Sequence, residues 1–346
     1  MIKLQNIQAL RGIAVLSVVL FHLVVIEKKY GGTNTILPDW LRFGMFGVDL
    51  FFVISGFVMV TVTRGKFREL KQSLLFLYHR VSRIYPLYWV YTTLALIVFI
   101  VQPSWVNSAQ GNQVNIVASY LLIPSNLLPI VLVGWTLIHE MYFYLVLFFI
   151  LLLFPERLLV PALLIWGAII VFFHSPGGNP FEFVIFHPLT LEFIAGCLLA
   201  VHYHDYKEIK ANGILLFVIA GIALIAAIFG YIHYNNVTGL SPLEWSEALY
   251  YGVPATVIVF CVTHAERNGT VLAPFLIQTG NASYSIYLSH LFTVNVVGRV
   301  WSLFAIDPII DNLIGLSAAF VLALVVGFIS YRFIEIPLLK LTRRSI

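Results

Sequence analysis

The sequence is poor in charged residues and nearly free of cysteine. Only 10% of its 346 residues are charged, whereas 60% are hydrophobic, a composition far too apolar for a soluble globular domain. The two cysteines, Cys197 and Cys261, lie inside apolar runs, where a free thiol behaves as a small hydrophobe. This usage excludes a disulfide framework and a cysteine metal cluster, and redox chemistry is not expected.

The sequence also lacks a basic patch, a repeat, a low-complexity tract and a soluble domain. Its formal net charge is +4, but the basic residues are scattered between apolar runs, which argues against a nucleic-acid partner. No small-x-small cleavage site follows the first apolar run, so this run is expected to remain in the mature protein. We predict an all-α polytopic membrane protein with one transmembrane domain over residues 1–346.

Ten apolar runs are long enough to cross a hydrocarbon core about 30 Å thick. The predicted helices span residues 7–26, 44–63, 84–101, 134–154, 158–173, 184–202, 213–232, 248–264, 282–304 and 309–331. With a cytoplasmic N-terminus, sixteen of the 20 Lys and Arg residues fall on the inner side and four on the outer side. This positive-inside bias places both termini in the cytoplasm.

Two connecting segments have features of their own. Residues 102–133 form a long outer loop without charge, whose apolar part is interrupted by proline, and we expect it to be interfacial or re-entrant. Residues 65–80, between the second and third spans, are basic and amphipathic, which is typical of a helix on the inner membrane surface.

The first apolar run carries two polar residues that lipid would not tolerate, Arg11 and His22. They stand eleven residues apart, and at 100° per residue this separation ends about 20° beyond three full turns. Both side chains are therefore expected on one helix face, roughly 16 Å apart along the axis. This geometry suits a long substrate, with a charged group held at Arg11 and a reacting group delivered to His22.

Three carboxylates also lie inside predicted spans: Asp49, Glu140 and Glu192. Each would cost about 2.5–3.5 kcal/mol if it faced lipid at the bilayer centre. We therefore expect them to face the protein interior, to pair or to be protonated.

Counted from the outer ends of their predicted spans, Asp49 and Glu140 lie at nearly the same depth in the membrane as His22. A carboxylate beside a histidine fixes the imidazole tautomer and stabilises the imidazolium, so His22 could deprotonate a hydroxyl. The alternative is a core histidine bonded to a backbone carbonyl, with Asp49 as a helix-terminal cap. Arg11 on the same face favours catalysis.

Other motifs allow a functional or a structural interpretation. Arg80 and Arg83 are neighbours on a helix and suit phosphate, although spacing alone favours simple positive-inside anchors. The Ser55–Gly56 step is typical of close helix packing. His290, about halfway along its span, fits a core hydrogen bond as well as a function.

Two further pairs have simple interpretations. Position 143 is Phe, so the second histidine that a zinc HExxH motif requires after His139 and Glu140 is missing, and no metal site is predicted. Glu335 is expected to form an interfacial ion pair with Arg332.

Together these segments resemble the acyltransferase 3 family of integral membrane acyltransferases, which modify cell-envelope sugars and related molecules. The resemblance runs nearly end to end. It is carried by Arg11 and His22 in LRGIAVLSVVLFH, Asp49 in GVDLFFVISGF, Arg80, Arg83 and Tyr85 in RVSRIYPLYW, Trp135 and Glu140 in GWTLIHEMYFY, Tyr284 and His290 in YSIYLSH, and Glu335 and Pro337 in FIEIP. Unlike many relatives, this sequence has no proline after His290, and we expect no appended periplasmic hydrolase-like domain.

The resemblance implies an acyl-CoA donor, with acetyl-CoA preferred, and an acceptor on the outer side. We predict an O-acyltransferase of the bacterial inner membrane that acts on a saccharide or lipid-linked saccharide. The catalytic residues are assigned as His22, Asp49 and Glu140, the donor-binding residues as Arg11, Arg80, Arg83 and Tyr85, and the supporting residues as His290, Tyr284 and Glu335. Polysaccharide-assembly proteins or a second copy of the chain are the expected protein partners.

Two other classes of function remain open. A proton-coupled transporter of a small polar solute would use the intramembrane Asp, Glu and His residues as a relay or solute site. Transporters often show paired halves with broken helices, and the sequence shows no such correspondence. In a non-catalytic sensor or assembly subunit, Arg11 and His22 would be incidental.

Overall fold

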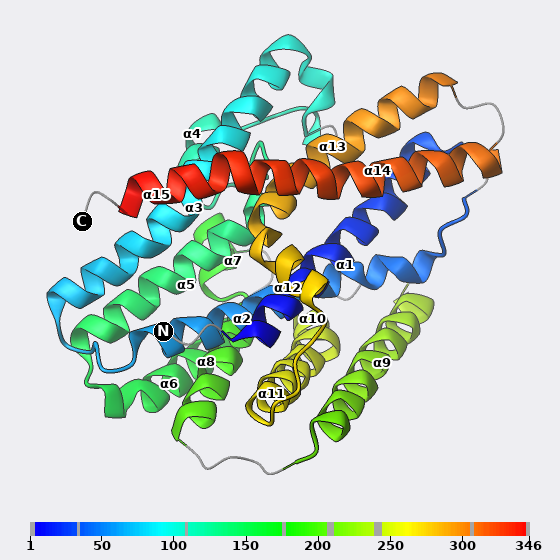
Figure 1. The fold of residues 1–346 in the computed structure, drawn as a ribbon. Coiled ribbons are helices and arrows are strands. Elements are labelled where there is room, and N and C mark those ends of the chain that lie inside the picture. The colour runs from blue at the N-terminus through cyan, green and yellow to red at the C-terminus, as the bar shows by residue number, and fades with distance from the viewer. Residues whose placement is uncertain are drawn as a thin grey trace. The chain divides into compact units, whose positions relative to one another are not determined.

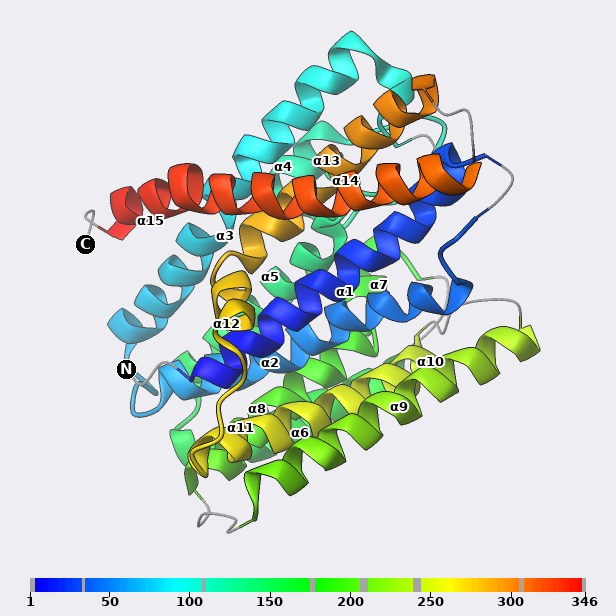
Figure 2. The ribbon, with the colours of Figure 1, turned by 45° about the vertical axis from the view of Figure 1, so that its right-hand side comes forward.

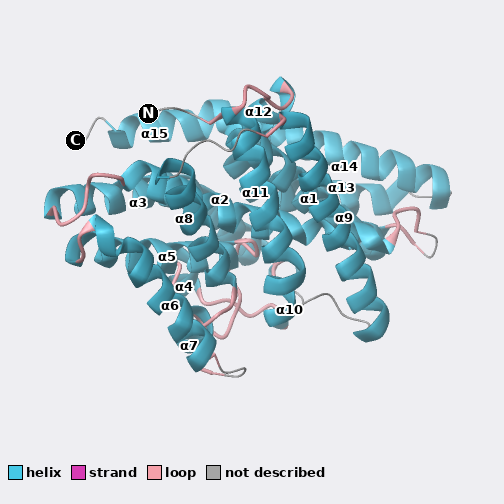
Figure 3. Ribbon diagram, turned by 90° about the horizontal axis from the view of Figure 1, so that it is seen from below, coloured by secondary structure: helices cyan, strands magenta, loops and turns pink. Residues whose placement is uncertain are grey.

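The described part of the chain is entirely helical in its regular structure. The computed structural model describes residues 4–32, 35–107, 110–174, 178–205, 211–238, 244–304 and 308–343. Helices are the regular elements within these ranges (Figure 1, Figure 3). Nine helical stretches among these residues are long and apolar enough to span a membrane. The predicted all-α polytopic membrane fold is confirmed.

Each of the ten predicted spans is matched by a helix. These helices are α1 (Gln5–Tyr30), α2 (Phe46–Thr63), α3 (Leu70–Val101), α5 (Gly134–Leu153), α6 (Leu159–Phe173), α8 (Leu189–Asp205), α9 (Gly213–Thr238), α11 (Val253–Arg267), α13 (Ser283–Phe304) and α14 (Pro308–Ser330). Shorter helices are α4 (Ile116–Leu121), α7 (Pro180–Ile185), α10 (Trp245–Glu247), α12 (Pro274–Asn281) and α15 (Ile336–Arg343). A 3-10 helix, Asp39–Met45, precedes α2, and π-helical turns, Ala248–Gly252 and Tyr331–Glu335, precede α11 and α15.

Two details differ from the sequence prediction. The 22-residue helix α13 is not among the nine apolar stretches, because polar residues such as His290, Asn295 and Arg299 lower its hydropathy. A separate surface helix over residues 65–80 is wrong, since α3 begins at Leu70 and continues unbroken through the third predicted span. The amphipathic segment is the first part of one long helix.

The chain packs as two compact units. The first consists of Met1–Ser55 and Asp205–Phe333, and the second of Gly56–His204 and Ile334–Ile346. Helix α2 contributes its first part to the first unit and its second part to the second. The single membrane domain predicted for the whole chain stays a prediction.

Helix α1 is the central element of the first unit. It packs against α11, α12, α13, α14 and the 3-10 helix before α2 (Figure 1, Figure 2). Glycines allow the contact with α12: a Cβ atom on Gly280 would lie 1.7 Å from the carbonyl oxygen of Gln8, and one on Gly12 would lie 2.3 Å from that of Leu276. A larger residue at either glycine would force the two backbones apart.

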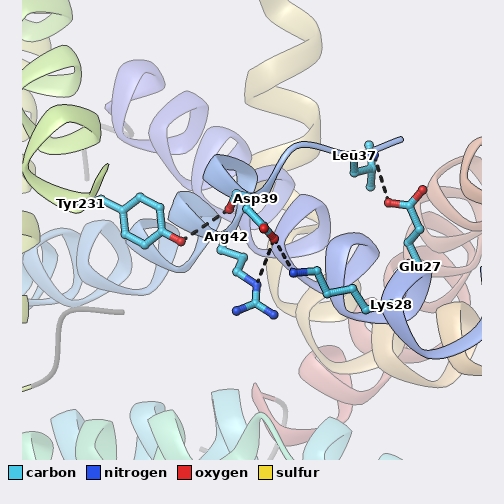
Figure 4. A network of polar contacts seen from close by, with 6 residues as sticks. All are labelled: Glu27, Lys28, Leu37, Asp39, Arg42 and Tyr231. Atoms are coloured by element: carbon cyan, nitrogen blue, oxygen red, sulfur yellow. Dashed lines mark hydrogen bonds and ion pairs between the residues drawn. The ribbon is translucent and has the colours of Figure 1, made fainter. Parts of the chain in front are cut away.

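Carboxylates fasten both ends of α1. At its start, Glu266 of α11 accepts hydrogen bonds from the backbone N–H groups of Gln5 (2.7 Å) and Asn6 (2.8 Å), which have no partner within the helix. Near its end, the buried Glu27 accepts hydrogen bonds from the backbone N–H groups of Ile36 (2.7 Å) and Leu37 (3.0 Å), of which Figure 4 shows the second. These bonds fix the position of α1 along its own axis within the first unit.

In the second unit, α3 holds the long loop of residues 102–133. The Tyr85 hydroxyl donates to the carbonyl oxygen of Leu121 (2.8 Å), and the indole N–H of Trp89 donates to that of Tyr120 (2.9 Å). Tyr85 stands midway along the 32 residues of α3, about 24 Å from its end at 1.5 Å per residue. The loop therefore turns back along α3 to its middle, which supports the re-entrant interpretation over the interfacial one.

Close packing at Gly56 is confirmed within the second unit. A Cβ atom there would lie 2.0 Å from the carbonyl oxygen of Phe193 on α8. The thiol of Cys197, one turn further along α8, lies 3.5 Å from the carbonyl oxygen of Gly56. The cysteine thus behaves as a small core residue, as its apolar surroundings predict.

Candidate functional site

Two buried histidines from distant parts of the chain meet in the first unit. His22 of α1 and His290 of α13 are 9% and 0% exposed. Nε2 of His290 lies 3.1 Å from Nδ1 of His22, and the ring centroids are 4.8 Å apart. Sequence patterns alone did not pair these residues. The signal that was available is the YSIYLSH motif, which places a histidine within an otherwise apolar predicted span.

Backbone carbonyls decide which ring nitrogens carry the hydrogens. Nδ1 of His290 lies 2.8 Å from the carbonyl oxygen of Tyr287 and 3.1 Å from that of Ile286. A carbonyl only accepts, so this nitrogen carries the hydrogen, and Nε2 of the neutral ring is an acceptor. Nδ1 of His22 lies 2.9 Å from the carbonyl oxygen of Val18, so it carries a hydrogen as well and points it at Val18 and His290.

The remaining nitrogen of His22 keeps its lone pair. In a neutral imidazole with a hydrogen on Nδ1, Nε2 is unprotonated. Nε2 makes no hydrogen bond with any residue that the structure describes, and the ring packs edge-on against Phe21 with centroids 4.9 Å apart. An imidazole held through one nitrogen with a lone pair on the other is suited to act as a general base or a nucleophile.

Asp49 lies in the first unit, as His22 does. It is buried in the first turn of α2. The hydrogen-bond and ring partners of the His22 side chain among the described residues are Val18, Phe21 and His290. His290 is therefore a neighbour of His22 that the sequence did not indicate, and a catalytic role of Asp49 stays a prediction.

Arg11 and His22 lie on one uninterrupted helix, as predicted. Helix α1 has no break between Gln5 and Tyr30. The two residues are therefore separated by three turns, roughly 16 Å along the axis. His22 is buried and Arg11 is half-buried, so neither side chain is fully exposed on the surface of the helix bundle.

Arg80 and Arg83, on α3 in the second unit, differ in their partners. Arg83 forms an ion pair through Nη1 with Glu335, which is 1% exposed, while the Arg83 side chain is 28% exposed. The sequence favoured Arg332 as the partner of Glu335. Arg80 makes no ion pair with any described residue, and its Nε atom is buried without a hydrogen-bond partner. One guanidinium is paired with a buried carboxylate, and the other has no ion pair among the described residues.

The other assigned residues have contacts that do not test their roles. Glu140 accepts a hydrogen bond from the Tyr144 hydroxyl, one turn further along α5. The Tyr85 hydroxyl donates to the carbonyl oxygen of Leu121 in the long loop, a contact that the sequence did not predict. Tyr284 is half-buried on α13, in the first unit. Glu192 is buried in the first turn of α8, as its cost in lipid requires.

The fold is that of a polytopic membrane protein, and two buried imidazoles meet inside its first unit. Residues 4–332 match the acyltransferase 3 family, which is described as an acyltransferase domain, and the chain belongs to this family. It is a multi-pass membrane enzyme that transfers acyl groups, and the predicted family is confirmed.

Known proteins of two bacteria are similar to the chain. The exopolysaccharide production protein ExoZ of Rhizobium meliloti (strain 1021) is 30% identical over 314 residues, which cover 86% of this chain and 90% of that protein. Proteins named "Putative O-acetyltransferase" in Staphylococcus aureus strains COL and N315 are 23% identical over 379 aligned residues. These alignments cover 97% of this chain and 57% of the staphylococcal proteins. No solved structure gives a significant match.

Proposed function

We propose that this acyltransferase moves an acetyl group from acetyl-CoA to a hydroxyl of a cell-envelope or exported saccharide. The similarity to an exopolysaccharide production protein and to proteins named as O-acetyltransferases supports this substrate pair. The positive-inside bias supports an inner-membrane location with cytoplasmic termini. The structural observation that supports the chemistry is the contact of Nδ1 of His22 with the Val18 carbonyl oxygen and with Nε2 of His290, which assigns the hydrogen to Nδ1 and the lone pair to Nε2.

Two routes use this nitrogen. As a general base, Nε2 takes the proton of the acceptor hydroxyl while the hydroxyl oxygen attacks the thioester carbonyl carbon. The C–S bond then breaks, and the proton passes from Nε2 to the CoA thiolate. As a carrier, Nε2 attacks the thioester itself, CoA leaves as the thiolate, and the acceptor oxygen then takes the acyl group from the imidazole while its proton goes to the thiolate. Both routes need the lone pair on Nε2.

The phosphates of the donor require cations. We assign this role to Arg11, Arg80 and Arg83, because guanidinium groups bind phosphate through paired hydrogen bonds. The absence of an ion pair at Arg80 within the described residues supports its assignment. Tyr85 is assigned to the donor with the arginines of its motif. In the first unit, Arg11 is separated from His22 by a distance that suits an extended carrier arm.

The carboxylates are assigned to the acceptor side of the reaction. Asp49 is buried, and Glu140 accepts a hydrogen bond from the Tyr144 hydroxyl. A carboxylate of this kind can accept hydrogen bonds from a saccharide hydroxyl or share a proton with the base. We propose that Asp49 and Glu140 each perform one of these two tasks.

Replacing His22 tests the proposal. Purified protein in nanodiscs is incubated with labelled acetyl-CoA and a saccharide acceptor, and transfer is compared for wild type, His22→Ala and His264→Gln. His264 is another buried histidine of the first unit, so its variant controls for the loss of a core imidazole. We expect His22→Ala to abolish transfer with insertion and helicity unchanged. Substantial transfer by this variant would remove His22 from the mechanism, and solute movement without thioester consumption would indicate a transporter.

A further inference from the structure

We propose that His290 is a positioning residue for His22: it accepts the Nδ1 hydrogen of His22 and stabilises the positive charge that His22 acquires during transfer. This inference rests on the function proposed for His22. It assigns to a second imidazole the task that a carboxylate was expected to perform.

The hydrogen bonds made by Nδ1 of His290 leave its Nε2 atom as a hydrogen-bond acceptor. Its Nδ1–H is shared by two carbonyl oxygens of its own helix, those of Ile286 and Tyr287, and the ring is 0% exposed. A 180° flip of the ring would put the Cδ2 atom in the place of Nδ1 and lose both hydrogen bonds. The orientation is therefore fixed, and Nε2 points its lone pair at Nδ1 of His22, 3.1 Å away. Because α1 and α13 pack together in the first unit, this geometry is built into the fold.

The hydrogen bond becomes stronger when His22 reacts. After Nε2 of His22 takes the hydroxyl proton, or forms a bond to the acyl carbon, the ring carries a positive charge and its Nδ1–H becomes a charged donor. Hydrogen bonds with one charged partner are shorter and about twice as strong as neutral ones. In an apolar interior, where an isolated charge is costly, this increase acts on the reacting state more than on the resting state.

Val18 and His290 contribute differently to this arrangement. The Val18 carbonyl comes from the preceding turn of α1 and by itself fixes the hydrogen on Nδ1, at 2.9 Å. His290 is therefore not needed to select the tautomer. Its contribution is a second acceptor that faces the ring when the ring is charged. Loss of His290 should lower the rate while the tautomer of His22 is retained.

The test compares His290→Leu, His290→Gln and the control His264→Gln. The glutamine amide oxygen reaches about as far as Nε2 of histidine and can accept the same hydrogen bond. His264 matches His290 in burial, and its Nδ1 also bonds the carbonyl four residues earlier, that of Phe260, at 2.9 Å. Transfer of labelled acetyl groups in nanodiscs gives kcat and KM for acetyl-CoA, and thermal unfolding reports on the fold.

We expect His290→Leu to lower kcat about 10- to 100-fold, the effect of one hydrogen bond to a charged group, with KM for acetyl-CoA within about twofold of wild type. His290→Gln should recover most of this loss, and His264→Gln should transfer at the wild-type rate. An unchanged kcat in His290→Leu, an equal loss in the leucine and glutamine variants, or an equal loss in His264→Gln would overturn the inference.

A measurement on the unmodified protein does not depend on activity or on variants that fold poorly. Nitrogen-15 NMR of histidine-labelled protein should show a hydrogen on Nδ1 of His22 and a scalar coupling across the N–H···N bond to Nε2 of His290. A hydrogen on Nε2 of His22 would overturn the positioning role directly. If the coupling is present but His22→Ala still transfers acyl groups, the proposed function of His22 fails and the hydrogen bond stands.

Discussion

Replacing Arg83 with alanine should destabilise the fold, apart from any effect on donor binding. Arg83 neutralises Glu335, which is 1% exposed, so the variant leaves a buried carboxylate without its guanidinium. Removing one partner of a buried pair costs about 3–5 kcal/mol. The Arg83 side chain is 28% exposed, so water screens the pair in part and the lower end of this range, about 3 kcal/mol, applies.

Replacing the other partner of the ion pair, Glu335, should lower the free energy of unfolding by less than Arg83→Ala does. Glu335→Gln keeps an oxygen that accepts a hydrogen bond from the guanidinium, and the partly exposed Arg83 stays hydrated, so we expect a loss of about 1 kcal/mol. The double variant lacks the buried charge and should lose about 2 kcal/mol. Compared with the sum of the single losses, about 4 kcal/mol, this gives a coupling of about 2 kcal/mol.

Reversible unfolding in mixed detergent micelles, followed by circular dichroism, measures these free energies. Arg80→Ala, one turn away on the same helix and without an ion pair to any described residue, should lose less than about 1 kcal/mol. Single losses that simply add in the double variant, within about 0.5 kcal/mol, would refute the reasoning. Acetyl-CoA affinity should be compared in the Glu335→Gln background, where Arg83→Ala should weaken binding about tenfold if Arg83 holds a phosphate.

Two further predictions concern packing. Gly280→Val should lower the free energy of unfolding by about 1–3 kcal/mol, because the new side chain would overlap the backbone of α1 near Gln8; an unchanged unfolding midpoint would contradict this close contact. Tyr85→Phe should remove a hydrogen bond worth about 1 kcal/mol and speed amide hydrogen exchange in α4 while leaving α5 protected. Equal exchange of α4 in the wild type and in Tyr85→Phe would show that the loop is held by other contacts.

Much of the fold could be predicted because membrane-spanning helices are local features of the sequence. An apolar run of sufficient length forms a helix wherever it lies, so each predicted span is matched by one. The error at α3 has the same origin. The basic amphipathic segment before residue 84 satisfies the pattern of a surface helix, and nothing in the pattern shows that the helix continues through it without a break.

The sequence predicted only those relations in the site that join residues of the same helix. Arg11 and His22 are related by helical periodicity, so their shared helix follows from the sequence. The contacts of His22 with His290 and of Arg83 with Glu335 join residues 268 and 252 positions apart. No periodicity relates such positions, and only the packing of α1 on α13 and of α3 on the chain near α15 brings them together.

The carboxylates at both ends of α1 also constrain how substrates are selected. Hydrogen bonds at the first and last turns oppose sliding of α1 along its axis, which would keep Nε2 of His22 near one height along the helix. A donor anchored by its phosphates at Arg11 would present its thioester carbonyl at that height whatever acyl chain it carried. The enzyme would then discriminate between acetyl and longer acyl groups by the volume beyond the His22 imidazole that the acyl chain can occupy, and not by how it binds the coenzyme.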